Sequence, residues 1–168
     1  MKKHILIEQN LDLSNSINSL VFLEQLSIDY DITLVCSKSF FHYIEGVSFL
    51  FKVYTYDQIL QDIDQKLFNL SFSYAAYLSL DFKAIFLEKA YQYSVPIRLG
   101  FIQNNVKKQL LTDHIQSCFL QGHSLFLYQE LFSILSSKVF DFFLSSYYSH
   151  SSFGSMKQYC QKYCLSKN

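Results

Sequence analysis

Short apolar runs alternate with longer segments of helical spacing through the first hundred residues, and this alternation limits the chain to few folds. An apolar run at residues 4–8 is followed by a polar loop and by residues 15–28, where apolar side chains recur at helical spacing. Residues 31–37 then form a compact β-rich run, typical of a parallel strand that is covered on both faces. The sequence therefore predicts a βαβ unit at the start of the chain.

The same alternation continues to about residue 101. We expect further strands at residues 51–56, 68–74 and 97–101, and helices at 39–45, 58–67 and 80–93. Pro96 disfavours helix in the residue before it, which places the end of the last helix before Val95. Strands that alternate with helices in this way predict a Rossmann-like, doubly wound α/β fold with a parallel sheet and right-handed crossovers.

Beyond residue 101 the alternation weakens. A polar loop at 103–109 leads to a short expected strand at 110–115 and an expected helix at 123–135, and residues 145–155 are rich in Ser, Tyr and His. We expect one domain over residues 1–145, and a linker with a terminal helix over 146–168. The apolar stripe of that helix requires a packing partner; its members are Met156, Tyr159, Cys160 and Tyr163.

Composition excludes several classes of protein. The chain has 168 residues, of which 50% are hydrophobic and 17% charged, a balance that favours a packed core over disorder. Fourteen basic residues face fourteen acidic ones with no long basic run, which argues against nucleic acid as a partner. The first apolar run is too short for a signal peptide, and no stretch approaches the length of a membrane span. We therefore expect a cytoplasmic protein without a membrane span.

The four cysteines do not indicate a metal site. None has zinc-finger spacing, and in the cytoplasm we expect their thiols to stay reduced. Cys160 and Cys164 lie one helical turn apart, but two thiols leave a tetrahedral metal site half empty. His114, His123 and Cys118 show no coordinating pattern. We expect neither a metal nor another cofactor.

Several blocks resemble a family of enzymes. HILIEQNLDLSNSINSLVFLEQL at residues 4–26, VPIRLGFIQNNVKKQLLTDHI at 95–115 and GHSLFLYQELFSIL at 122–135 are similar, in order, to segments of the lipopolysaccharide heptosyltransferases. DITLVCS and FNLSFSY match that family's next strands. These enzymes are inverting, ADP-heptose-dependent glycosyltransferases of the GT-B architecture. The resemblance covers about residues 4–145 and implies the N-terminal, acceptor-binding domain, with the donor domain absent.

The resemblance places this chain's Ser14 and Asn15 where the family has a Gly-Asp pair, and Asn69 where it has a further Asp. The carboxylate of that pair is the family's presumed general base. A carboxylate accepts a proton from the acceptor hydroxyl, whereas a carboxamide does not, so Asn15 is a degenerate base position that retains hydrogen bonding. Asp12 and Glu8 are the only nearby carboxylates, and either substitutes as the base if the loop folds differently; Asp12 is also a candidate turn residue or helix cap, which is the favoured interpretation.

The resemblance also suggests binding partners. Arg98, Lys107 and Lys108 are expected around the loop after the fifth strand, where they either hold an anionic lipopolysaccharide core or form a solvated surface. Two hypotheses remain open. One is an acceptor-binding half that acts with a separately encoded donor domain or by self-association, at the inner face of the inner membrane. The other is a non-catalytic binding module or degenerate remnant.

Overall fold

The computed structural model describes residues 2–68, 70–77, 85–102, 108–116 and 135. Six strands form one parallel sheet; they are β1 (Lys3–Gln9), β2 (Tyr30–Cys36), β3 (Lys52–Thr55), β4 (Tyr74–Tyr77), β5 (Ile97–Ile102) and β6 (Asp113–Gln116). The helices are α1 (Leu13–Leu26), α2 (Lys38–Ile44), α3 (Tyr56–Leu60), α4 (Ile63–Lys66), α5 (Ile85–Gln92) and the 3₁₀ turn η1 (Lys108–Leu110). The strand order β3-β2-β1-β4-β5-β6 is that of a Rossmann-like, doubly wound sheet, which confirms the predicted fold class.

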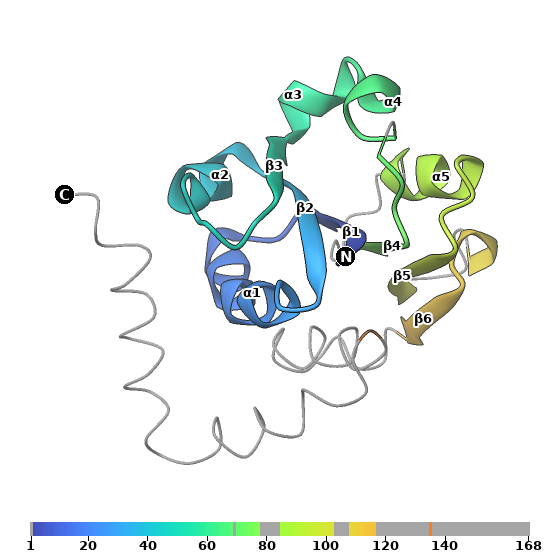
Figure 1. Cartoon of the computed structure of the whole chain (residues 1–168), viewed down its shortest axis with the longest axis horizontal. Helices are drawn as coiled ribbons and strands as arrows, with labels where there is room; N and C mark the ends of the chain where they lie inside the picture. The colour runs from blue at the N-terminus through green and yellow to red at the C-terminus, as the bar shows by residue number, and fades with distance from the viewer. Residues whose placement is uncertain (1, 69, 78–84, 103–107, 117–134, 136–168) are drawn as a thin grey trace, which may run out of the picture.

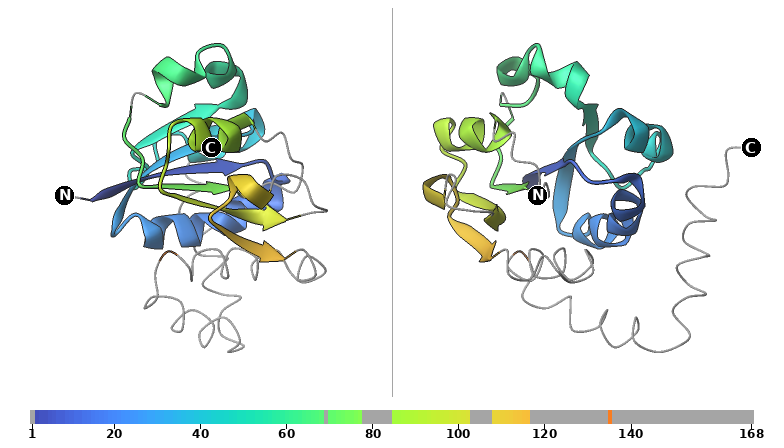
Figure 2. Two further views of the ribbon diagram at one scale, coloured as in Figure 1. Left: turned by 90° about the vertical axis from the view of Figure 1, so that its right-hand side faces the viewer. Right: turned by 180° about the vertical axis from the view of Figure 1, so that it is seen from behind.

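Helices cover both faces of the sheet. In Figures 1 and 2, α1 and α2 lie on one side, and α3, α4 and α5 lie on the other. Alternate residues of β1 enter the two layers, because successive side chains of a strand point to opposite faces. Ile5 and Ile7 pack with α1 and α2, whereas Leu6 packs with the α3–α5 layer. This explains why β1 and β2 each contain a continuous apolar run, Ile5–Ile7 and Leu34–Cys36, instead of a strict alternation.

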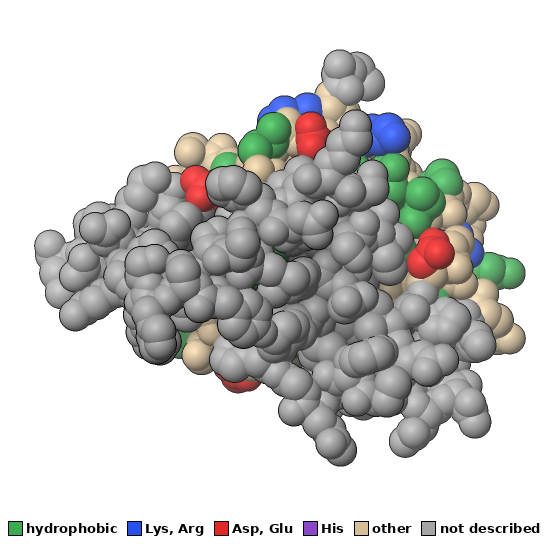
Figure 3. All heavy atoms as spheres, turned by 90° about the horizontal axis from the view of Figure 1, so that it is seen from below, with side chains coloured by type: hydrophobic (Ala, Val, Ile, Leu, Met, Phe, Trp, Pro, Cys, Tyr) green, Lys and Arg blue, Asp and Glu red, His purple; other side chains and the backbone are tan. Residues whose placement is uncertain are grey.

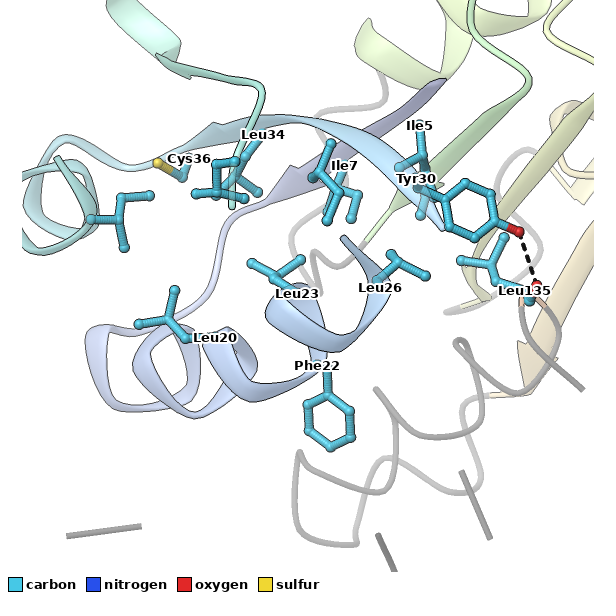
Figure 4. Packing of buried hydrophobic residues seen from close by; sticks show 14 of the residues in the cluster. Ile5, Ile7, Leu20, Phe22, Leu23, Leu26, Tyr30, Leu34, Cys36 and Leu135 are labelled. Carbon is cyan, nitrogen blue, oxygen red and sulfur yellow. Dashed lines mark hydrogen bonds between the residues drawn. The ribbon is translucent and has the colours of Figure 1, made fainter. Parts of the chain in front are cut away.

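The α1 side of the core extends to a distant part of the chain. Leu20, Leu23 and Leu26 line the inner face of α1 and pack against Ile5 and Ile7 (Figure 4). Leu135 is buried in the same cluster, beside Tyr30. The apolar spacing of α1 therefore corresponds to a buried stripe, as expected for a helix that covers a sheet.

The predicted strand at 68–74 is wrong, because the fourth strand is β4, Tyr74–Tyr77. Phe68 and Phe72 are buried in the α3–α5 layer. The backbone N–H of Leu70 donates to the carbonyl of Leu67, and the chain stays in this layer before it enters β4. The strand itself has Ala75 and Ala76 at its centre, between β1 and β5. A short apolar run does not distinguish a buried connection from a strand, and here the aromatic residues belong to the connection.

Two further expected elements differ from the structure. The single helix expected at 58–67 is divided into α3 and α4 at Asp62, whose φ of −155° is not helical. The strand expected at 110–115 begins later, at Asp113, because Leu110 and Leu111 pack in the α3–α5 layer instead of joining the sheet. The expected helices at 123–135 and 156–165 and the domain boundary at 145 lie outside the described residues, apart from Leu135.

The described surface carries both signs of charge. Figure 3 shows acidic and basic side chains interspersed over the part of one face that the structure describes. Within the described residues, no helix is both long enough and apolar enough to cross a membrane. Among the same residues, no three His, Cys, Asp or Glu side chains are grouped so that they could hold a metal ion.

Candidate functional site

The carboxyl ends of β1 and β4 meet at the point where the strand order reverses. From β1 the chain continues outward through β2 to β3, and from β4 it continues in the opposite direction through β5 to β6. Ligands of open α/β sheets bind outside the carboxyl ends of the strands at such a switch point. Glu8 of β1 and Tyr77 of β4 are register partners there, so they mark the floor of the candidate site.

The loop after β1 ends in a capped helix. Asp12 is the N-cap of α1, and its carboxylate accepts hydrogen bonds from the backbone N–H of Asn15 at 2.9 Å and from the Asn15 side-chain amide at 2.5 Å. Asp12 therefore caps the helix, one of the two roles expected for it from the sequence. Ser14 is the second residue of α1 and is exposed, whereas Asn15 is half-buried.

This arrangement limits what the head of α1 can do chemically. The Asn15 carboxamide has no basic site for a proton, and its amide group donates to Asp12. The Asp12 carboxylate is exposed, but its two oxygens accept from Asn15. Ser14, Asn15 and Asp12 together offer hydrogen bonds to a hydroxyl-bearing ligand. A substrate-binding role for Ser14 and Asn15 stays a prediction.

Glu8 is one of the two carboxylates that the sequence offered as a substitute base, but its burial was not expected from the sequence. It lies at the end of β1 with 3% of its surface exposed, and its Oε1 accepts a hydrogen bond from the Tyr56 hydroxyl. Its Oε2 is buried without a hydrogen-bond partner. Burial raises the pKa of Glu8 from 4.5 to about 7, against the opposing effect of the Tyr56 hydrogen bond. A lone acidic residue that ends an apolar run at a switch-point strand is the signal that could have identified it.

The groups around Glu8 stay neutral near pH 7. Burial is the main cause that raises the pKa of Tyr56 and of Tyr77, and the nearby Glu8 carboxyl adds to it. Burial also raises the pKa of the Cys36 thiol at the end of β2 to about 12. Within this cluster, Glu8 is thus the group whose protonation changes near neutrality.

Gln9 faces the opposite side of the sheet from Glu8. Its Oε1 accepts a hydrogen bond from the Ser19 hydroxyl of α1 at 3.1 Å, and its Nε2 is buried without a partner. Ser19 also donates to the carbonyl of Ser16, one turn earlier in the helix. These contacts fix the last residue of β1 against α1, immediately before the polar loop.

Arg98 contacts the segment that follows the fifth strand, but it does so from the amino-terminal end of β5 and not from the carboxyl edge of the sheet, and its role in ligand binding stays a prediction. Arg98 is the second residue of β5, and its guanidinium donates to the carbonyls of Leu110 at 2.6 Å and Val95 at 2.5 Å. It also stacks over the Tyr91 ring, 5.3 Å from the centroid. In the parallel register Arg98 pairs with Ala75, near the amino-terminal end of β5, whereas Gly100 pairs with Tyr77 near the carboxyl edge of the sheet. Arg98 therefore joins η1 to the entrance of β5.

The structure leaves the other expected site residues largely unplaced. Lys107 and Asn69 lie outside the described residues, as do His123 and Cys118. Lys108 opens η1, on the segment between β5 and β6, and only its backbone is described. An acceptor-binding role for Lys107 and Lys108 therefore stays a prediction.

Comparisons with known proteins give one structural likeness. No protein-family model matches the sequence, and no curated protein matches it. Among solved structures, the fold is similar to a glycosyl transferase family 9 protein from Veillonella parvula, with a TM-score of 0.64 and 13% sequence identity. The match covers 81% of this chain and 42% of the other chain, so this chain spans less than half the length of its structural neighbour.

The likeness concerns the fold. At 13% identity, a common sheet and helix arrangement is shown, whereas a common substrate is not. The arrangement is a Rossmann-like α/β domain, the fold class expected from the sequence. The function of the site has to be argued from its residues.

Proposed function

We propose that this chain is the acceptor-binding half of a glycosyltransferase similar to the lipopolysaccharide core heptosyltransferases, and that it does not catalyse transfer alone. The observation that carries this proposal is the head of α1 at the carboxyl edge of a 3-2-1-4-5-6 sheet. There, Ser14 and Asn15, which the resemblance aligns with the family's Gly-Asp pair, lie in the first turn of α1, and Asn15 donates a hydrogen bond to Asp12. The likeness in fold to a family 9 glycosyltransferase supports the same proposal.

The reaction explains why an amide at position 15 matters. In an inverting transfer, the acceptor oxygen attacks the anomeric carbon, its proton passes to a base, and the bond to the nucleoside diphosphate breaks. A carboxylate accepts that proton, but the Asn15 carboxamide does not. Asn15 is thus suited to orienting an acceptor hydroxyl by hydrogen bonding, but it is not suited to removing the proton of that hydroxyl.

Acceptor and donor have different places in this proposal. The acceptor is an anionic, hydroxyl-rich core saccharide at the inner face of the inner membrane, which Ser14, Asn15 and the lysines of residues 107–108 would contact. The ADP-heptose would bind to a donor domain encoded separately, or to an assembly of chains. No cofactor or metal takes part in the proposed step.

Calorimetry with two ligands tests the assignment. We expect a phosphorylated inner-core oligosaccharide to bind, and ADP to bind weakly or not at all. Asn15→Ala should weaken oligosaccharide binding about tenfold, because one well-oriented hydrogen bond is lost. Asn18→Ala, one turn later in the same helix, is the matched control and should bind as the unchanged protein does. Tight ADP binding, or equal affinity in both variants, would contradict the proposal.

The runner-up function is a non-catalytic binding module or degenerate remnant. The use of the Asp12 carboxylate as a helix cap, together with the Asn15 amide, favours it, because neither group is then available as a base. The two functions differ once a donor domain is present. If a complementary α/β donor domain is added and ADP-heptose is turned over, the split-enzyme proposal stands; if the saccharide binds but turnover stays absent, the binding module stands.

A further inference from the structure

A buried carboxyl group lies under a short helix at the switch point. Glu8 ends β1 in the sheet interior, and the Tyr56 hydroxyl above it belongs to the first residue of α3. One carboxyl oxygen accepts from Tyr56, and the other is buried without a hydrogen-bond partner. An unpaired buried oxygen is tolerated on a neutral carboxyl far better than on a carboxylate.

Among the described residues, the groups that interact with Glu8 and its cluster are neutral or acidic, and none is a cation. Tyr56 on α3, Tyr77 on β4 and Cys36 at the end of β2 form one electrostatic cluster with Glu8, and Glu88 of α5 adds a negative charge beside Tyr77. Burial and the Tyr56 hydrogen bond are the two influences on the Glu8 carboxyl, and burial is the larger. An ionised Glu8 would therefore be buried without a compensating charge from the described residues.

The segment that covers Glu8 is suited to local opening. Helix α3 has five residues and follows β3, the edge strand of the sheet. Its start is held by a capping box between Thr55 and Gln58, and its inner face by the buried Ile59 and by the Tyr56 ring, which lies 5.8 Å from the ring of Phe86. So small a packed face can separate from the sheet at much lower free energy than the doubly covered core.

We propose that the burial of the Glu8 carboxyl beneath Tyr56 is a pH-sensitive latch: α3 stays closed over the carboxyl end of β1 when Glu8 is protonated, and its opening is favoured when Glu8 ionises, because the cost of burying a carboxylate outweighs its stronger hydrogen bond to Tyr56. Opening brings water to the carboxylate and exposes it at the switch point between β1 and β4. The latch does not depend on the function proposed above. The open state would present the Glu8 carboxylate to a ligand bound at the carboxyl edge of the sheet, where position 15 offers only an amide.

Native-state hydrogen exchange of Gln58, Ile59 and Leu60 tests the latch. We expect these amides to exchange through a local opening of α3, which exposes little surface, so that its free energy depends only weakly on urea. The amides of β1 and β2 should instead exchange through global unfolding, whose free energy depends strongly on urea. Their protection factors should fall by about 50-fold between pH 5 and pH 8 and then level off, because the closed state binds the proton more tightly.

Three variants make the test specific. Glu8→Gln should remove the pH dependence, whereas Asp57→Asn, which removes an exposed carboxylate from α3 itself, should retain it. Tyr56→Phe should move the midpoint of the Glu8 carboxyl titration, followed by carbon NMR, to higher pH, since the Tyr56 hydrogen bond favours the ionised form.

Two results would overturn the latch. One is a pH dependence that survives in Glu8→Gln, which would assign the effect to another group. The other is exchange of α3 amides only through global unfolding, with the urea dependence of β1 and β2, which would show that α3 does not open separately.

Discussion

The Tyr30 hydroxyl donates a hydrogen bond of 3.0 Å to the backbone carbonyl of Leu135, a residue 105 positions later in the chain (Figure 4). Tyr30 opens β2 and is buried, and its ring also meets Tyr74 of β4 edge to face. Leu135 packs beside them against the α1 side of the core. This bond joins the first βαβ unit to a part of the chain far beyond the sixth strand.

Removing that hydroxyl should weaken the domain. Tyr30→Phe keeps the ring but leaves the buried Leu135 carbonyl without this donor, so we expect a loss of about 1 kcal/mol in the free energy of unfolding, measured by urea denaturation. Tyr43→Phe is the matched control, because Tyr43 is exposed, and it should be neutral. An equal effect of the two substitutions would mean that the bond contributes nothing to stability.

Stability should depend on pH through Glu8. The folded state raises the pKa of this carboxyl from 4.5 to about 7, so it retains the proton at pH values where the unfolded chain has lost it. The free energy of unfolding should therefore fall as the pH rises from about 4.5 to 7, by about 3 kcal/mol, and change little above that range. Glu8→Gln should abolish this decline. A decline of the same size in Glu8→Gln would refute the assignment.

Placing a carboxylate at position 15, where the resemblance puts the aspartate of the Gly-Asp pair, should have a structural cost. Asn15→Asp would place a second carboxylate against Asp12, where the Asn15 amide now donates at 2.5 Å. We expect a loss of roughly 1 kcal/mol at pH 7, because like charges replace a hydrogen bond at the helix cap.

The double variant Asp12→Asn with Asn15→Asp controls for this effect, because it restores one amide and one carboxylate in exchanged positions. Thermal denaturation should place it near the unchanged protein. Neither variant should give the isolated chain heptosyltransferase activity, since a base without an oriented donor has nothing to catalyse. Turnover of ADP-heptose by Asn15→Asp alone would contradict the proposed division into halves.

Gly100 should not tolerate a larger residue. A Cβ at this position would lie 3.0 Å from Cβ of Tyr77 and 3.1 Å from a methyl group of Leu111. We expect Gly100→Ala to lower the free energy of unfolding by about 1–3 kcal/mol, since β4 and β5 would have to shift. Gly46 provides a contrast: its φ is +86° but nothing lies within 4 Å of an added Cβ, so Gly46→Ala should cost about 1 kcal/mol through backbone strain. A neutral Gly100→Ala would exclude close packing there.

The sequence by itself determined the layered fold. Buried strands such as β1 and β2 read as apolar runs, and α1 reads as an amphipathic helix with a polar cap, because these patterns depend on local periodicity. The same local signals located the polar loop before α1 and the role of Asp12 as its cap. A doubly wound parallel sheet follows from the alternation of these elements.

Tertiary structure decided the rest, because burial depends on which segments meet. Phe68 and Phe72 pack in the α3–α5 layer and not in a strand, so β4 starts later than the apolar run at residues 68–74 predicts. Arg98 found acceptors at Val95 and Leu110 through the register of β5, which no local pattern contains. In the sequence, Glu8 does not differ from any other carboxylate. In the folded chain, burial among residues of β4, α3 and α5 excludes water from it and raises its pKa to about 7.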